Sequence, residues 1–202
     1  MSILKEKLKS KIENWRPRTS RLIKEYGDVK ISDVTIGQAI GGARGVKCLT
    51  TDISYLDPME GIRFRGYTIP EVLEKLPKVK GGDMPYVEGF FYLLLTGDIP
   101  SEKDALDVAE EFKKRQHVPE YVFNILRAMP IDSHPMVMFS TAILAMEKES
   151  VFVEKYNEGM SKMDYWDPTY EDGLNLLAKL PRIASFIYRL KYKDNDIIKR
   201  KS

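Results

Sequence analysis

The chain has 202 residues, of which 43% are hydrophobic, and it carries 32 basic and 30 acidic side chains. This balance is typical of a globular protein rather than a disordered one. It argues against nucleic-acid binding as the main role, because proteins of that class gather an excess of basic residues on one face. The longest apolar runs, such as FFYLLL, are too short to span a bilayer. We therefore expect neither a nucleic-acid nor a membrane partner.

Cysteine and histidine are both scarce. Cys48 is the only cysteine, which excludes a disulfide within the chain and a zinc site built from several thiolates. The two histidines are His117 and His134, and no H-E-x-x-H or C-x-x-C motif is present. We therefore predict no metal site. His117 is expected in a loop, and His134, which precedes a proline, is expected to satisfy backbone groups at the start of a helix.

The N-terminal part of the chain combines one long helical pattern with a region of short strands. Apolar residues recur at helical spacing over residues 3–26. Pro17 is expected to bend or break this helix, and Gly27 is expected to cap it. The next residues, about 30–66, are rich in β-branched residues and glycines, which indicate short strands and turns. The fold class is therefore predicted to be mainly α, with a small β element.

A helical core is predicted over residues 69–193. One buried helix is expected to end at Gly97, where glycine can adopt the left-handed conformation of a helix cap. The following helix is expected to begin at Ser101, which forms a capping box with Asp104. The last helix contains Pro181, which we expect to kink it.

The segment SHPMVMFSTAILAMEKES is apolar on nearly every face between Met136 and Met146. Ser133 is expected to cap this helix at its N-terminus. A helix without a polar face must be covered on all sides. In a chain of this length, such a helix indicates a subunit interface or a missing part of the fold. On the interface interpretation, a Met138→Asp variant should lose self-association.

No motif in the chain by itself names a reaction, since the nucleophile-elbow, P-loop and dinucleotide fingerprints do not occur. The nearest feature to a phosphate cradle is GGARGVK at Gly41–Lys47. Its glycines allow close backbone approach, and Arg44 and Lys47 supply charge, although a simple turn is the alternative. Arg63 and Arg65 alternate with apolar residues, so a short strand would place both on one face. We expect these two arginines to pair with nearby carboxylates or backbone carbonyls rather than to form an anion site.

Several long segments resemble the citrate synthase family, and they occur in the family's order. They are GGARGVKCLTTDISYLDPMEGIRFRGYTIPE, LPKVKGGDMPYVEGFFYLLLTGDIPSEKD, DSHPM with the apolar helix after it, and YWDPTYEDGLNLLAKLPRIA. The resemblance extends from about Leu4 to Lys193 and covers only the first half of the family. It implies that residues 1–202 form the N-terminal portion of the family's large helical domain, without the small catalytic domain.

The family condenses acetyl-CoA with oxaloacetate to give citrate and CoA, the first step of the tricarboxylic acid cycle. Its two catalytic histidines and one aspartate, which suit general acid–base chemistry, lie in the second half. His117 and His134 match neither of those histidines, so the resemblance assigns no catalytic residue here and implies that this chain alone is inactive. It also implies no prosthetic group. The alternatives are 2-methylcitrate synthase, which uses propionyl-CoA, and a non-catalytic dimerisation or scaffold protein derived from the family.

Two CoA contacts follow from the resemblance. Arg44 matches a family arginine that contacts CoA phosphates near the subunit boundary. Lys162, in EGMSKMDYW, stands where close relatives have another phosphate-binding arginine, and lysine keeps the charge but lacks the planar fork. The resemblance also implies a homodimer, in which helices at about Glu120–Met129 and Pro135–Glu147 pack against their mates.

The two ends of the chain also carry expectations. Met1-Ser2 comes directly before the family's first helix, which favours a bacterial cytoplasmic protein; a eukaryotic source would place it in the mitochondrial matrix. After Lys193 the chain becomes polar and basic, in DNDIIKRKS. We interpret this change as a cut within a loop and expect the natural protein to continue beyond Ser202.

Overall fold

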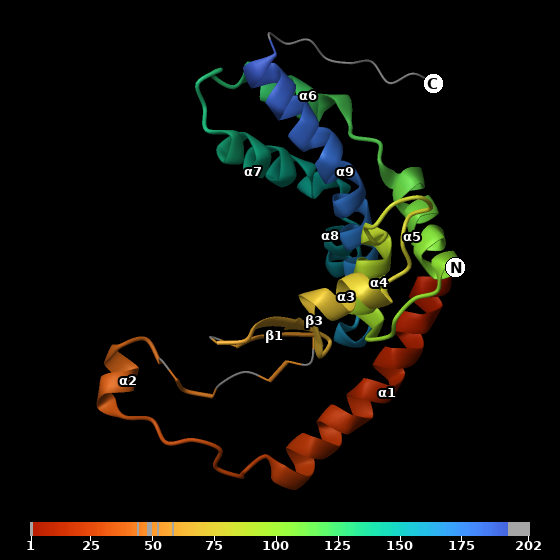
Figure 1. Ribbon diagram of the computed structural model, residues 1–202. Coiled ribbons are helices and arrows are strands. Elements are labelled where there is room, and N and C mark those ends of the chain that lie inside the picture. Colours follow the sequence, from red (N-terminus) through yellow and green to blue (C-terminus); the bar gives the residue numbers. More distant parts are fainter. Residues whose placement is uncertain (1, 44, 48–49, 52, 58, 194–202) are drawn as a thin grey trace. The chain divides into compact units, whose positions relative to one another are not determined.

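The computed structural model describes residues 2–43, 45–47, 50–51, 53–57 and 59–193, which form helices and one small sheet (Figure 1). The chain divides into two compact units, Met1–Val108 and Ala109–Ser202. The elements of the first unit are α1 (Ile3–Tyr26), α2 (Ile36–Ile40), β1 (Ser54–Asp57), β2 (Gly61–Phe64), β3 (Tyr67–Thr68), α3 (Ile69–Lys75) and α4 (Val87–Thr96). Helix α5 (Glu102–Arg115) crosses the boundary. The second unit contains α6 (Glu120–Ala128), α7 (Pro135–Ala145), η1 (Met146–Glu149), α8 (Val151–Asn157), η2 (Lys162–Asp164) and α9 (Trp166–Tyr192).

Helix α1 runs through Pro17 as one element, so a break at this proline does not occur. A proline removes one backbone donor, which leaves the carbonyl of Glu13 without its helical partner. Both residues are exposed, and water can take the place of the lost donor. Gly27 does cap the helix, with its N–H donating to the carbonyl of Ile23 at 2.9 Å, but its φ of −59° is right-handed.

The N-terminal half of α1 is packed against the rest of its unit. Leu4 and Leu8 are buried, and the helix contacts α4. Beside these leucines, the Nζ atoms of Lys7 and Lys11 lie 3.0 and 2.8 Å from the carboxylate of Asp98. Asp98 directly follows Gly97, which ends α4. The two ion pairs therefore fasten α1 to the end of α4.

Asp98 is expected to make the stability of this attachment depend on pH. Burial alone would raise the pKa of Asp98, but hydrogen bonds and charge from Lys11 and Lys7 lower it below its ordinary value of 3.8. The stabilisation is therefore present above the unfolded-state pKa and is lost as the pH falls through the folded-state pKa. We expect Asp98→Asn to lower the free energy of unfolding by about 0.5–1 kcal/mol at pH 7, since these partly exposed pairs are screened.

Urea unfolding of the parent and Asp98→Asn chains between pH 7 and pH 3 measures this difference, which should shrink at the acid end. Asp33→Asn is the matched control, because Asp33 pairs only with its near neighbour Lys30 on an exposed segment. A difference that stays constant down to pH 3 would show that the charge of Asp98 is not responsible.

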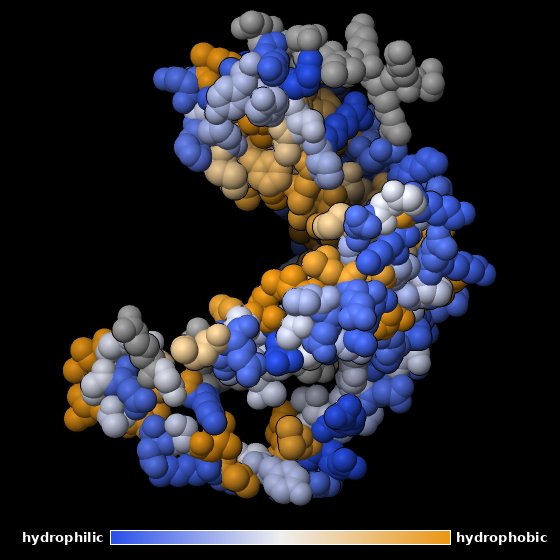
Figure 2. All heavy atoms as spheres, viewed as in Figure 1, coloured by the Kyte–Doolittle hydropathy of each residue, from blue (hydrophilic) through white to orange (hydrophobic). Residues whose placement is uncertain are grey.

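The small β element that the sequence predicts is an antiparallel sheet in the order β1-β2-β3. It occupies residues 54–68, so it fills only the second part of the expected range. The first part contains α2, a short helix with a capping box between Thr35 and Gln38. Ile36 and Ile40 on this helix are 80% and 83% exposed, and apolar side chains gather over the α2 segment in Figure 2.

The sheet is joined to α3 and α4 by one apolar cluster. Its buried members are Val72, Leu76 and Leu93, with Phe64, Tyr67, Phe90 and Ile99 packed around them. The rings of Phe64 and Phe90 meet edge to face, with their centroids 4.9 Å apart. The predicted helix ends are confirmed here, because Gly97 caps α4 with a φ of 77° and Ser101 exchanges hydrogen bonds with Asp104.

The second unit is built around α6, α7 and α9. Its core cluster consists of Val118, Val122, Phe123, Leu126, Met138, Ala142, Met146, Ile183, Phe186, Ile187 and Leu190. Met138 is 0% exposed and therefore belongs to the chain's own core. The expectation that Met138 reports on a subunit interface is wrong for this reason. Met136, Val137 and Leu144 on the same helix are the exposed apolar residues.

One detail of a helix end differs from the sequence prediction. His134, not Ser133, is the N-cap of α7, and its Nδ1 accepts a hydrogen bond from the N–H of Met136 at 3.2 Å. This is the structural role expected for His134. Helix α9 runs as one element through Pro181, which is exposed, as is Leu177 one turn before it. Among the described helices, none has both the length and the apolar character needed to cross a membrane.

Candidate functional site

Residues 41–43 follow α2 in turns, and Gly45 lies in a further turn. Gly42, Ala43 and Gly45 have φ values of 81°, 59° and 73°. The N–H of Ala43 donates to the carbonyl of Gln38 at 2.7 Å, and with Gly42 in the left-handed region this bond ends α2 as in a Schellman motif. The positive φ of Gly42 therefore belongs to the end of a helix, a position where glycine is common. Arg44, the predicted CoA contact, lies outside the residues that the structure describes.

Lys162, the other predicted CoA contact, is the first residue of η2 and is exposed. The hydroxyl of Ser161 caps this short helix by accepting a hydrogen bond from the N–H of Met163 at 3.2 Å. Lys162 makes no ion pair with any residue that the structure describes. Its ammonium group is therefore available to an anionic ligand. Gly41–Lys47 and Lys162 belong to different units of the chain.

Arg63 pairs with its own hairpin, as the sequence predicts. Its Nη2 lies 2.9 Å from the carboxylate of Glu60, and its Nη1 donates to the carbonyl of Gly66 at 3.2 Å. Both groups come from the turns at the two ends of β2. Arg63 is therefore engaged within the sheet.

Arg65 does not share a strand face with Arg63, because β2 ends at Phe64. Phe64 pairs with Tyr67, so Arg65 and Gly66 form a two-residue hairpin loop. Their φ values of 50° and 89° are those of a type I′ turn. The Arg65 side chain reaches α4 instead, where Nε and Nη2 donate to the carbonyl of Leu94 at 2.9 and 2.7 Å. The predicted pairing with backbone carbonyls is confirmed, and the predicted strand position is wrong.

The two histidines lie at separate positions in the second unit. His117 is exposed in the loop between α5 and α6, and His134 caps α7. Within the described ranges, no three His, Cys, Asp or Glu side chains are placed to hold a metal ion.

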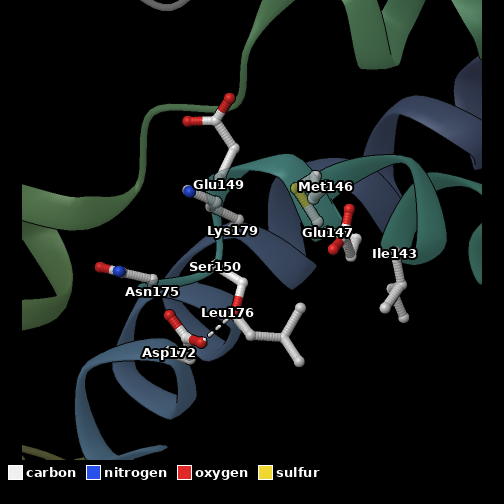
Figure 3. A pocket seen from close by; sticks show the side chains of 9 residues that line it. All are labelled: Ile143, Met146, Glu147, Glu149, Ser150, Asp172, Asn175, Leu176 and Lys179. Atoms are coloured by element: carbon white, nitrogen blue, oxygen red, sulfur yellow. Dashed lines mark hydrogen bonds between the residues drawn. The ribbon is translucent and has the colours of Figure 1, made fainter. Parts of the chain in front are cut away.

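A small cavity of about 150 Å³ lies in the second unit (Figure 3). It is lined by Ile143, Met146, Glu147, Glu149, Ser150, Asp172, Asn175, Leu176 and Lys179. Clefts that hold drug-sized ligands measure about 300–1,000 Å³, so this one is too small for a nucleotide-sized substrate. Its most prominent polar pair is structural, since the hydroxyl of Ser150 donates to Asp172 at 2.6 Å.

Asp172 caps α8 from a neighbouring helix, which the sequence analysis did not identify. Its carboxylate accepts hydrogen bonds from the N–H groups of Val151 at 2.8 Å and Phe152 at 3.1 Å. The first-turn N–H groups of a helix need such acceptors. In the sequence, Ser150 could have indicated the start of α8, because a serine before an apolar helical segment is a common N-cap. Asp172 lies 22 residues further along the chain, and no nearby sequence pattern indicates that it caps this helix.

Comparison with known proteins agrees with the resemblance seen in the sequence. The family model described as "Citrate synthase, C-terminal domain" matches residues 42–202. The mitochondrial citrate synthase of Aspergillus niger is 47% identical over 194 residues, which cover 96% of this chain and 41% of that protein. The mitochondrial citrate synthases of Saccharomyces cerevisiae and Xiphias gladius are 45% and 44% identical, and 96% of this chain matches 40% and 42% of their lengths. The chain thus spans about two fifths of the length of these relatives.

The fold agrees with that of a solved structure. The crystal structure of citrate synthase from Pyrobaculum aerophilum matches with a TM-score of 0.64 over 80% of this chain and 38% of that one. Its sequence is 23% identical, so this likeness concerns the fold alone. Taken with the match of the family model to most of the chain and the close relatives, it shows that the chain belongs to the citrate synthase family.

Proposed function

We propose that this chain is the N-terminal portion of a citrate synthase, which condenses acetyl-CoA with oxaloacetate to citrate and CoA. The observation that carries this proposal is the 47% identity over 96% of the chain with a citrate synthase. The chain matches about two fifths of that protein, so the remaining part would supply the catalytic histidines and aspartate. We expect the 202-residue chain alone to be inactive. 2-Methylcitrate synthase, which uses propionyl-CoA, remains the alternative enzyme.

We further propose that this portion contributes contacts to the phosphates of CoA, through Arg44 and Lys162. Lys162 is exposed and belongs to an ordered turn, which supports the assignment. Its single ammonium group supplies charge but not the bidentate fork of an arginine. CoA would act here as a substrate, and no prosthetic group is proposed.

A homodimer that packs through about Glu120–Met129 and Pro135–Glu147 is also proposed. Helix α7 carries no charged residue between Pro135 and Ala145, yet Met136, Val137 and Leu144 on it are exposed within this single chain. Exposed apolar side chains that gather on one element are typical of an interface. A scaffold protein that kept only these helices is the alternative class, and CoA binding distinguishes the two.

The matched relatives are named as mitochondrial citrate synthases, which supports the mitochondrial matrix as the proposed compartment. The bacterial cytoplasm stays a prediction from the sequence.

Lys162→Ala is expected to weaken binding of CoA to the chain about threefold to tenfold, the usual effect of losing one charge-assisted contact. Isothermal titration of the parent and variant chains with CoA measures this. The matched control is Lys155→Ala, because Lys155 is another exposed lysine of the second unit but already pairs with Glu158 at 3.0 Å. Equal weakening by both variants would point to non-specific charge, and a parent that does not bind CoA would contradict the proposed contact.

A further inference from the structure

Arg65 occupies a backbone position that does not suit arginine. With a φ of 50°, it is one of two non-glycine residues with positive φ among those described. The first position of a type I′ turn is normally taken by asparagine, aspartate or glycine, because these residues tolerate the positive φ that the turn requires. A residue held in this region of φ/ψ space indicates that the surroundings require it. What arginine adds at this turn is the reach of its guanidinium.

The guanidinium of Arg65 closes the C-terminal end of α4. It donates to the carbonyl of Leu94 through two nitrogens, and Nη2 also donates to the carbonyl of Leu95 at 3.2 Å. The last carbonyls of a helix lack helical partners and lie at the negative end of its dipole. A guanidinium there donates hydrogen bonds to these carbonyls and also interacts favourably with the dipole. The side chain also lies against Gly97, the left-handed cap of the same helix.

The same side chain reaches α1. Its guanidinium carbon lies 5.3 Å from the ring centroid of Trp15, which is a cation–π distance. At its backbone, the N–H of Arg65 donates to the carbonyl of Ile53 at 2.7 Å. Ile53 is the point at which the chain arriving from Gly41–Lys47 enters β1. One residue therefore connects α1, α4, the hairpin and the chain that leads into it.

We propose that Arg65 is a positioning residue that holds the sheet β1-β2-β3 on α4 and α1, and thereby holds the incoming chain at the place where it receives the phosphates of CoA. The last step rests on the proposed function, whereas the anchoring of the sheet does not. The hydrogen bonds of Arg63 instead go to Glu60 and Gly66, which lie in the turns of the sheet itself. Losing Arg63 should leave the sheet where it is.

Arg65→Asn tests the proposal, because asparagine tolerates positive φ and removes only the guanidinium. In a chain whose only cysteine, Cys48, is replaced by serine, spin labels on Leu56→Cys in β1 and on Val87→Cys at the exposed start of α4 report the distance between the sheet and α4. We expect a broader distance distribution in Arg65→Asn than in the parent, with CoA binding weakened about tenfold. The control Arg63→Asn should change neither quantity.

If Arg65→Asn unfolds the first unit, Arg65→Lys takes its place, since lysine keeps the charge but not the fork, and intermediate broadening is expected. An unchanged distance distribution in the folded variant would overturn the proposal. Broadening in a chain whose parent does not bind CoA would support the anchoring and overturn the proposed CoA contact. Unchanged CoA affinity despite broadening would overturn the link between anchoring and CoA.

Discussion

Replacing Met138 by aspartate is expected to unfold the second unit of the chain. Met138 is fully buried among apolar side chains of α6, α7 and α9. Truncating a buried methionine costs about 2–5 kcal/mol, and an unpaired carboxylate in the same place adds the cost of its desolvation. Since domains have a free energy of unfolding of about 5–15 kcal/mol, this single change can remove most of it. Urea unfolding followed by far-ultraviolet circular dichroism measures the loss.

The matched control is Leu144→Asp, the same kind of substitution six residues later on α7. Leu144 is 75% exposed within the chain, so the free energy of unfolding should change by less than about 1 kcal/mol. If α7 lies in a homodimer interface, Leu144→Asp should instead shift sedimentation toward the monomer. A folded, stable Met138→Asp chain would contradict the packing of α7, and unchanged association of Leu144→Asp would contradict the proposed interface.

Replacing Asp172 by alanine is expected to have the second largest effect. Asp172 accepts three hydrogen bonds at the start of α8, from the Ser150 hydroxyl and from the N–H groups of Val151 and Phe152. Charged acceptors make stronger hydrogen bonds than neutral ones, and the N–H groups left behind would lose their acceptor. We expect the free energy of unfolding to fall by about 2–3 kcal/mol, measured by urea unfolding.

Two further variants test this prediction. Asp172→Asn keeps one acceptor oxygen and should cost less than Asp172→Ala. Asp164→Ala removes an exposed carboxylate from nearby η2 and should leave the stability almost unchanged. If Asp172→Ala costs no more than Asp164→Ala, then α8 does not depend on this cap.

The sequence predicted the features of the fold that local chemistry determines. Gly97 ends α4 because only glycine readily takes the left-handed cap, and Ser101 with Asp104 begins α5 through a pairing confined to one turn. The break expected at Pro17 does not occur. A proline usually interrupts a helix, but at Pro17 and Pro181 the affected turn faces solvent, so both helices continue.

Tertiary contacts account for what the sequence did not show. Alternation predicts a strand position for Arg65, whereas strand β2 ends at Phe64 and the arginine side chain reaches Leu94 of α4, 29 residues away. The apolar pattern of α7 has no polar face, so it cannot indicate which residues face inward; Met138 does, and Leu144 does not. The predicted CoA contacts came from resemblance to the family, because an exposed lysine such as Lys162 has no distinguishing pattern of its own.

The central claim is that this chain is a portion of a citrate synthase whose catalytic residues lie in the remainder. Release of free CoA from acetyl-CoA and oxaloacetate, followed with a thiol reagent, tests it most directly. The 202-residue chain should give no release above the protein-free rate. The same chain, extended by the part of the Aspergillus niger enzyme that follows the matched region, should release CoA only when oxaloacetate is present, and faster with acetyl-CoA than with propionyl-CoA. Oxaloacetate-dependent turnover by the 202-residue chain alone would contradict the claim, as would a folded extended chain that binds CoA and does not turn over.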